Sequence, residues 1–126
     1  MPLDGPRLPT ETVAWETAPV VPGSAILLTE TLKLLDNGQH WIKRYTRRGG
    51  DYCMMGALQE VYWKSHCRRR DYRRAKRYLR AAVRENTYID RHWIMGFNDS
   101  PGTRWRHVQT AIERATEIAI TTEIRQ

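Results

Sequence analysis

The helical character of the chain is clearest in residues 51–86, which read DYCMMGALQEVYWKSHCRRRDYRRAKRYLRAAVREN. Two apolar patterns with helical spacing follow one another here, and they predict helices from about Tyr52 to His66 and from about Asp71 to Asn86. Asp51 is the expected N-cap of the first helix. The expected inward-facing side chains are Met54, Leu58, Val61 and Tyr62 in the first helix, and Tyr72, Ala75, Leu79, Ala82 and Val83 in the second. Within the first helix, Gly56 would let a second backbone approach closely.

One further helix is expected on each side of this pair. A leucine-rich pattern predicts a helix from Ser24 to about Asp36, with Gly23-Ser24 offering its N-cap and Asn37-Gly38 its stop. Thr103 is the expected cap of a fourth helix. The core positions of that helix would be Trp105, Val108, Ile112, Ala115 and Ala119. Residues 40–46 read as a short strand or an irregular extended stretch before a turn at Gly49-Gly50, and residues 88–97 read as a connection.

The length of 126 residues suits one domain. Five of the six prolines lie in residues 1–23, which predicts an extended Pro-rich arm there and a single helical domain over residues 24–126. The predicted fold class is mainly α. It is a single compact domain of about four helices with a flexible N-terminal arm and room for one short extended segment.

Several protein classes are excluded by the composition. No apolar run approaches the roughly 18 residues that a membrane span needs, and no signal peptide is visible, so the cytoplasm is the expected compartment. Cys53 and Cys67 are then expected to be reduced, with a bridge between them as the alternative. No zinc-type spacing, phosphate-binding glycine loop or catalytic carboxylate pair is present, so neither a metal nor a cofactor is expected.

The net charge of +7 is unevenly distributed. Most of the 21 basic residues lie between His40 and Arg80, where the only acids are Asp51, Glu60 and Asp71. The candidate anion-binding residues in and around the second of the two central helices are Arg68, Arg69, Arg70, Arg73, Lys76, Arg77, Arg80 and Arg84. Arginine favours planar, bidentate contacts with phosphate or carboxylate, although such a face can also serve solubility alone.

The motifs, taken in order, resemble a known family. A leucine-rich helix is followed by His40-Trp41-Ile42-Lys43, by Cys-x-x-Gly-Ala-Leu from Cys53 to Leu58, and by an Asn-Asp pair before a Thr-capped helix. This order resembles a domain-of-unknown-function family of small bacterial and phage proteins over about residues 25–118. The family usually has Trp-Asn-Asp where this chain has Phe97-Asn98-Asp99, and the cluster Arg68-Arg69-Arg70 is not part of its pattern. The resemblance implies one helical domain in a bacterial or phage setting and no established activity.

Cys53 is the candidate nucleophile. A thiol at a helix start is favoured as thiolate, and His92 with Asn98 or Asp99 would complete a Cys-His-Asn arrangement, which predicts a cysteine-dependent hydrolase or transferase. The competing interpretation is a buried cysteine that acts as a small hydrophobe. Asn98 and Asp99 likewise allow two interpretations, because they suit a turn or helix cap as well as a ligand contact.

The charge pattern favours a non-catalytic binding protein. Its Arg-rich surface would bind an anionic partner, with nucleic acid as the leading expectation and Tyr72, Tyr78 or Trp63 available for stacking. An acidic protein and a nucleotide or other phosphate-bearing small molecule are the alternatives. The apolar C-terminal helix, with Ile120 and Ile124, indicates docking onto the domain or a homodimer. No helix-turn-helix or RNA-binding motif is present, which favours a backbone binder over a sequence-specific reader.

Overall fold

The computed structural model describes residues 20–86, 89 and 91–124, so residues 1–19 of the expected arm lie outside the described residues. In chain order the elements are α2 (Gly23–Leu35), the 3-10 helix η1 (Asp36–Gly38), β1 (Arg47–Arg48), β2 (Asp51–Tyr52), α3 (Met54–Lys64), α4 (Arg69–Arg84), α5 (Ile94–Asp99) and α6 (Trp105–Ile124). The predicted mainly α single domain is confirmed. No helix in the described part of the chain is long and apolar enough to cross a membrane.

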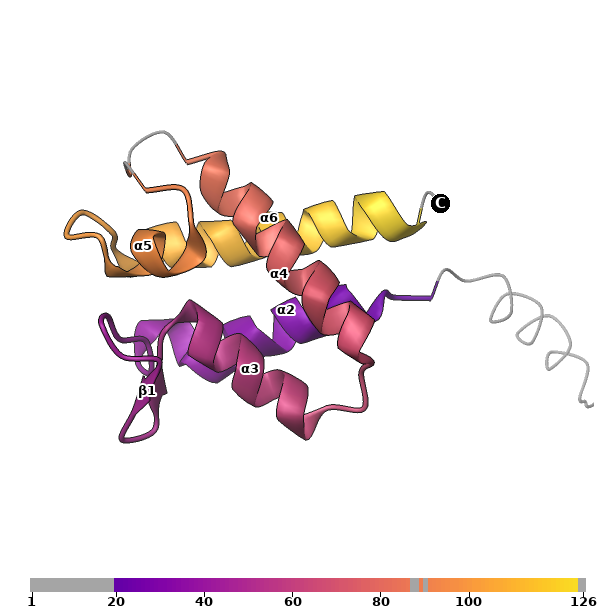
Figure 1. The fold of residues 1–126 in the computed structure, drawn as a ribbon, viewed down its shortest axis with the longest axis horizontal. Coiled ribbons are helices and arrows are strands. Elements are labelled where there is room, and N and C mark those ends of the chain that lie inside the picture. The colour runs from indigo at the N-terminus through magenta and orange to yellow at the C-terminus, as the bar shows by residue number, and fades with distance from the viewer. Residues whose placement is uncertain (1–19, 87–88, 90, 125–126) are drawn as a thin grey trace, which may run out of the picture.

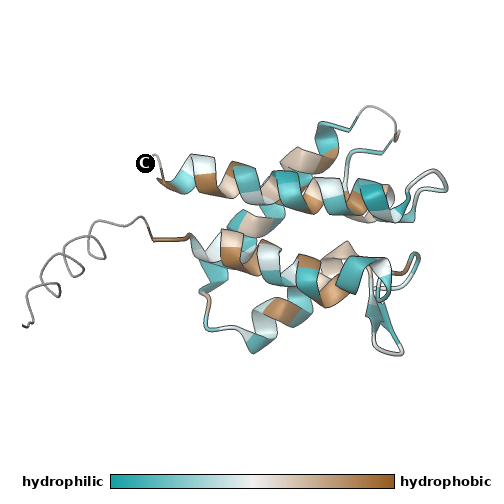
Figure 2. Ribbon diagram, turned by 180° about the vertical axis from the view of Figure 1, so that it is seen from behind, coloured by the Kyte–Doolittle hydropathy of each residue, from teal (hydrophilic) through white to brown (hydrophobic). Residues whose placement is uncertain are grey.

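Helix α4 crosses the pair formed by α2 and α6. Figure 1 shows α2 and α6 side by side and antiparallel, with α4 running diagonally in front of both and α3 against α2. In Figure 2, which views the molecule from behind, α2 and α6 lie in front of α4. Each of the five α-helices in the described part of the chain contributes a large, fully buried side chain to one core: Leu27, Leu58, Leu79, Phe97 and Ile112. Burying each such side chain stabilises the fold by about 1.5–3 kcal/mol.

Helix α2 stops where the sequence predicts. Asp36, Asn37 and Gly38 all have positive φ, with values of 49°, 54° and 91°. Asn and Gly adopt this left-handed region most readily, so the helix cannot continue through them. At Gly38 a Cβ would lie 2.9 Å from the ring of Trp105, so the absence of a side chain also lets the start of α6 pack against this turn.

The short extended segment lies later than predicted. β1 and β2 form an antiparallel hairpin over residues 47–52, while the predicted stretch over residues 40–46 contributes only an isolated bridge from Trp41 to Tyr52. Gly49 and Gly50 form the predicted turn, and their φ values of 59° and 88° suit a two-residue turn with positive φ at both positions. The twist of this turn matches that of the paired strands, which explains why the strands lie directly beside it.

The cap predicted for α3 was wrong, because the hairpin takes Asp51 and Tyr52 into β2. The helix begins at Met54, and Cys53 is its N-cap: the backbone N–H of Gly56 donates to the Cys53 sulfur at 3.3 Å. The cap predicted for α2 was also wrong. Pro22 occupies the N-cap position without a side-chain hydrogen bond, and the Ser24 hydroxyl donates to Glu123 instead.

The predicted connection over residues 88–97 contains an additional helix, α5, which begins at Ile94 and extends past the predicted connection to Asp99. Phe97, fully buried, anchors this helix in the core. The expected role of Thr103 as a cap was wrong as well, because its hydroxyl donates to the Phe97 carbonyl at 2.6 Å and α6 begins only at Trp105. His107 takes over part of the capping function, since its Nδ1 accepts the backbone N–H of Arg104 at 2.9 Å.

The C-terminal helix docks onto the domain. Ala115 and Ala119 are fully buried, and Ile118 packs partly against the core. Ile120 and Ile124 are each 40% exposed, so the end of α6 keeps some apolar surface in contact with solvent.

Candidate nucleic-acid interface

Helix α4 presents a row of arginines to solvent. At 3.6 residues per turn, Arg69, Arg73, Arg77, Arg80 and Arg84 fall within a sector about 80° wide and extend along about 22 Å of the helix. All five are exposed, while Ala75, Leu79 and Val83 on another side of the helix are buried. We call the five arginines the α4 stripe. Helix α4 lies across α2 and α6, and no other described helix or strand covers its side that faces away from these two helices (Figure 1).

Three described carboxylates that lie on α4, next to it or in contact with it have other partners. Asp71 accepts the backbone N–H of Arg68 at 2.9 Å. Glu85 pairs with Arg114 at 2.8 Å, and Glu123 pairs with Arg74 at 2.8 Å. None of the five stripe arginines forms an ion pair within the described part of the chain. Like charges three and four residues apart on a helix repel one another, so an anionic partner would be stabilised here.

The other predicted anion-binding residues flank the stripe. Arg70 is exposed, and Arg68 is an exposed residue just before the helix. Lys76 is half-buried, and its ammonium lies 4.9 Å from the centre of the Tyr72 ring, which holds it to one side. The structure therefore brings all eight predicted residues onto or beside one helix.

The three aromatic rings proposed for stacking differ in accessibility. Tyr78 is only 7% exposed, and its ring belongs to the core. Tyr72 is half-buried and stacks on Tyr62 with the ring centres 4.6 Å apart. Trp63, on α3, is 64% exposed. Among these three, Trp63 alone has a largely accessible ring.

Asn98 lies apart from this surface, at a buried junction. Its Oδ1 accepts the indole N–H of Trp41 at 2.7 Å and the backbone N–H of Met54 at 3.0 Å. Its Nδ2 donates to the Ile42 carbonyl at 3.0 Å and to Asp99 Oδ1 at 2.9 Å. The amide thus makes the four hydrogen bonds it is capable of, within the protein itself. Its geometry is that of a structural joint between the 41–44 segment, the start of α3 and α5.

Asp99 extends the same junction, because its Oδ1 also accepts the backbone N–H of Arg44 at 2.8 Å. Arg44 has a φ of 75°, so this bond helps to hold an unfavourable backbone conformation. The start of α3 packs just as closely: a Cβ on Gly56 would lie 1.8 Å from the Thr46 carbonyl oxygen. The close approach expected at Gly56 is confirmed, and the Cys-x-x-Gly and Asn-Asp motifs meet at one joint.

Cys53 belongs to this joint and is only 1% exposed. Burial raises the pKa of its thiol, and the negative charge of Asp99 adds to the increase, while the backbone N–H of Gly56 acts against it. The thiol is therefore protonated at neutral pH. The Cys53 sulfur also lies 4.0 Å from the Met95 sulfur. His92 is exposed, and among the described residues no hydrogen bond joins it to Cys53, Asn98 or Asp99.

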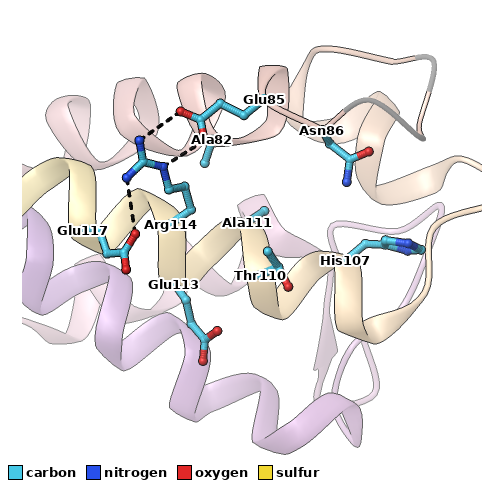
Figure 3. A pocket seen from close by; sticks show the side chains of 9 residues that line it. All are labelled: Ala82, Glu85, Asn86, His107, Thr110, Ala111, Glu113, Arg114 and Glu117. Carbon is cyan, nitrogen blue, oxygen red and sulfur yellow. Dashed lines mark hydrogen bonds and ion pairs between the residues drawn. The ribbon is translucent and has the colours of Figure 1, made fainter.

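A groove between α4 and α6 was not anticipated from the sequence. Figure 3 shows its lining, where the Arg114 guanidinium donates to both carboxylate oxygens of Glu85, at 2.8 and 3.2 Å, and to Glu117 at 3.3 Å. The hollow has a volume of about 410 Å³. With Glu113 also on its wall, carboxylates outnumber cations, so the groove does not suit a phosphate. The three-residue spacing of Arg114 and Glu117 on a helix could have indicated their ion pair, but nothing in the sequence indicates Glu85, which is distant along the chain.

His107 lines the same groove. Burial lowers its pKa, and the positive charges of Arg106, Arg104 and Lys43 lower it further. The ring is therefore neutral at neutral pH, which its role as hydrogen-bond acceptor at the start of α6 requires. Within the described residues, no group of three or more His, Cys, Asp or Glu side chains is arranged to hold a metal ion.

Comparison with known proteins identifies the family. A family of unknown function, DUF6197, matches residues 21–118, so the chain belongs to this family. No curated protein and no solved structure matches the chain. The matched region contains the Asn98 joint and the whole of α4.

Proposed function

We propose that this member of the DUF6197 family is a non-catalytic accessory protein of bacterial or phage origin that binds nucleic acid through the α4 stripe. The observation that carries the proposal is that five exposed arginines, which follow one helix face for about 22 Å, have no carboxylate partner among the described residues. A phosphate backbone supplies anions at regular intervals along a similar line. Guanidinium groups suit such contacts because they bind phosphate oxygens in a bidentate manner.

The proposed contact is with the backbone rather than with base edges. Phosphate contacts position a protein without reading sequence, and the stripe offers one kind of side chain throughout. The affinity should therefore be insensitive to base sequence and strongly dependent on salt, because bound cations are released from the nucleic acid when arginines replace them.

The test is a binding titration with labelled DNA and RNA at two or more salt concentrations, using the variant Arg73→Glu with Arg77→Glu. Both side chains are exposed and make no ion pair in the described part of the chain, so the thermal midpoint at moderate salt should be nearly unchanged. Binding should be lost at moderate salt. At low salt, the slope of log affinity against log salt should become shallower by about 2, corresponding to two lost phosphate contacts.

The matched control is Arg104→Glu with Arg106→Glu. These two arginines are also exposed, and the double variant changes the net charge by the same amount, but they lie at the start of α6 rather than on the stripe. The control should bind more tightly than the stripe variant and nearly as tightly as the wild type. Equal losses in both variants would show that only total charge matters and would contradict the stripe as the site. Binding of a polyglutamate peptide or of ATP in place of nucleic acid would assign the stripe to an acidic protein or a phosphate ligand.

A further inference from the structure

We infer that the β1–β2 hairpin and Trp63 form a stacking site for unpaired bases, so that the nucleic acid bound is single-stranded. The inference rests on the proposed function for phosphate binding by α4, but its evidence comes from a different surface. The indole of Trp63 is 64% exposed, and the guanidinium carbon of Arg47 lies 4.8 Å from its ring centre. Arg47 is fixed there by an ion pair with Glu60 at 2.9 Å.

A second exposed aromatic ring that contacts an arginine lies beside the hairpin. Tyr45 is 49% exposed, and the guanidinium carbon of Arg48 lies 4.6 Å from its ring centre. Tyr45 and Arg48 also line a shallow hollow of about 460 Å³. In each pair, an arginine covers part of an aromatic ring that otherwise faces solvent. Such a pair can hold a base against the open face of the ring, while the positive charge of the guanidinium attracts the neighbouring phosphate.

The hairpin geometry places the two pairs on opposite faces. Cross-strand pairing of Arg47 with Tyr52, and of Arg48 with Asp51, directs the two arginines to opposite sides of the ribbon. The tip between them is Gly49-Gly50, and a Cβ at either glycine would meet nothing within 4 Å. A nucleotide strand could therefore cross the tip without meeting a side chain there.

One aromatic stack connects α3, which carries Trp63, with α4. Tyr62 directly precedes Trp63 in α3, and the Tyr62 ring stacks on Tyr72 of α4 with ring centres 4.6 Å apart. Lys76 covers Tyr72 and lies one residue before Arg77 of the stripe. A single strand whose bases stack on Trp63 and Tyr45 can thus extend towards α4, where its phosphates would contact the α4 stripe.

Stacking of this kind selects against a duplex. Paired bases have both faces covered by their neighbours, so only unpaired bases can lie on an aromatic ring. Trp93 offers a useful contrast. It is 56% exposed and lies near Arg91, but its ring packs so closely on Gly96 that a Cβ there would be 2.2 Å away. One face of the Trp93 indole is therefore covered by the protein.

The experiment compares an oligothymidylate with a duplex of equal length, using the wild type and the variants Trp63→Ala and Tyr45→Ala. The wild type should bind the single strand more tightly. Each variant should weaken single-strand binding about 5- to 100-fold, which is the effect of losing one base–aromatic stack, and leave duplex binding unchanged. Trp63→Phe should restore most of the affinity. Trp93→Ala is the control and should bind as the wild type does.

The two proposals fail in distinguishable ways. Equal affinity for single strand and duplex, or unaltered single-strand affinity in a folded Trp63→Ala variant, would overturn the stacking site and leave phosphate binding by the α4 stripe in place. Loss of binding in Trp63→Ala combined with full binding in the double variant Arg73→Glu with Arg77→Glu would overturn the stripe instead. Quenching of tryptophan fluorescence by the oligothymidylate should disappear in Trp63→Phe, which tests base contact independently of affinity.

Discussion

The Cys53 thiol has two interpretations that chemical modification separates. Cys53 is 1% exposed, and burial raises the pKa of its thiol, so the reactive thiolate is scarce at neutral pH. Cys67 is half-buried, and its sulfur lies 3.7 Å from the Gly23 carbonyl at the start of α2. In the folded protein we expect iodoacetamide to modify Cys53 at pH 7 at least about 10-fold more slowly than Cys67.

The variant Cys67→Ser provides the control, because its only remaining thiol is Cys53. Mass spectrometry should show slow modification of this variant in buffer and rapid modification in guanidinium chloride, since unfolding exposes the sulfur. A Cys53 that reacted faster than free cysteine in the folded protein would contradict the structural interpretation. It would support the hydrolase or transferase hypothesis, with His92 moving towards the sulfur.

At the scale of elements, Asn98 joins α5 to the start of α3 and to the segment before the hairpin. In Asn98→Asp, a carboxylate oxygen would replace Nδ2 and face the Ile42 carbonyl and Asp99 Oδ1, both of which are acceptors. Two hydrogen bonds would become repulsive contacts in a buried position, so we expect the free energy of unfolding to fall by about 3 kcal/mol or more. Urea denaturation measures this loss.

The neighbouring variant Asp99→Asn keeps an acceptor oxygen for Asn98 and for the Arg44 backbone N–H, and we expect it to change stability by no more than about 1 kcal/mol. An Asn98→Asp protein as stable as the wild type at pH 7 would show that the joint has little energetic weight. The joint is also where the sequence was ambiguous, because Asn and Asp serve turns, caps and buried junctions alike.

Local patterns predicted the helices well, and contacts between distant segments account for most of what they missed. Apolar periodicity located α2, α3, α4 and α6 to within a few residues, because each of these helices buries one stripe. The hairpin took Asp51 away from its predicted capping role, and Cys53 replaced it. Helix α5 is only six residues long and is held by the burial of Phe97, so it is too short to show a period.

The candidate surface also has a part that the sequence predicts and a part that depends on contacts between distant segments. The arginine spacing on α4 could be predicted, since a helix fixes which side chains share a face. The ion pairs of the acidic residues could not be predicted, because Glu85 pairs with Arg114 and Glu123 pairs with Arg74, and both partners are distant in sequence. The contact between Arg47 and the Trp63 ring could not be predicted either, because Arg47 lies in the hairpin and is distant in sequence.

At the scale of the whole molecule, Glu123 ties together three helices. Its carboxylate, near the end of α6, accepts the Ser24 hydroxyl of α2 at 2.5 Å and pairs with Arg74 of α4 at 2.8 Å. Burial acts to raise its pKa, but hydrogen bonds from Ser24, Tyr78 and Arg74 outweigh this effect and lower the pKa. Because the pKa is lower in the folded state than in the unfolded state, Glu123 contributes its full stabilisation above the unfolded value of about 4.3.

This contribution should be lost as the pH falls from about 5 through the folded pKa of Glu123. In that range the unfolded state binds a proton more readily than the folded state, in which the hydrogen bonds keep Glu123 ionised. Glu123→Gln should lower the free energy of unfolding at pH 7 by about 1–3 kcal/mol and make the decrease of that free energy below about pH 5 less steep. Glu113→Gln is the control, since Glu113 is exposed and its one polar side-chain contact within residues 20–86, 89 and 91–124 is a long one with Gln109, at 3.5 Å. Urea denaturation at several pH values measures both effects. If Glu123→Gln and the wild type lost stability equally on acidification, the link between α2, α4 and α6 would have to rest on apolar packing alone.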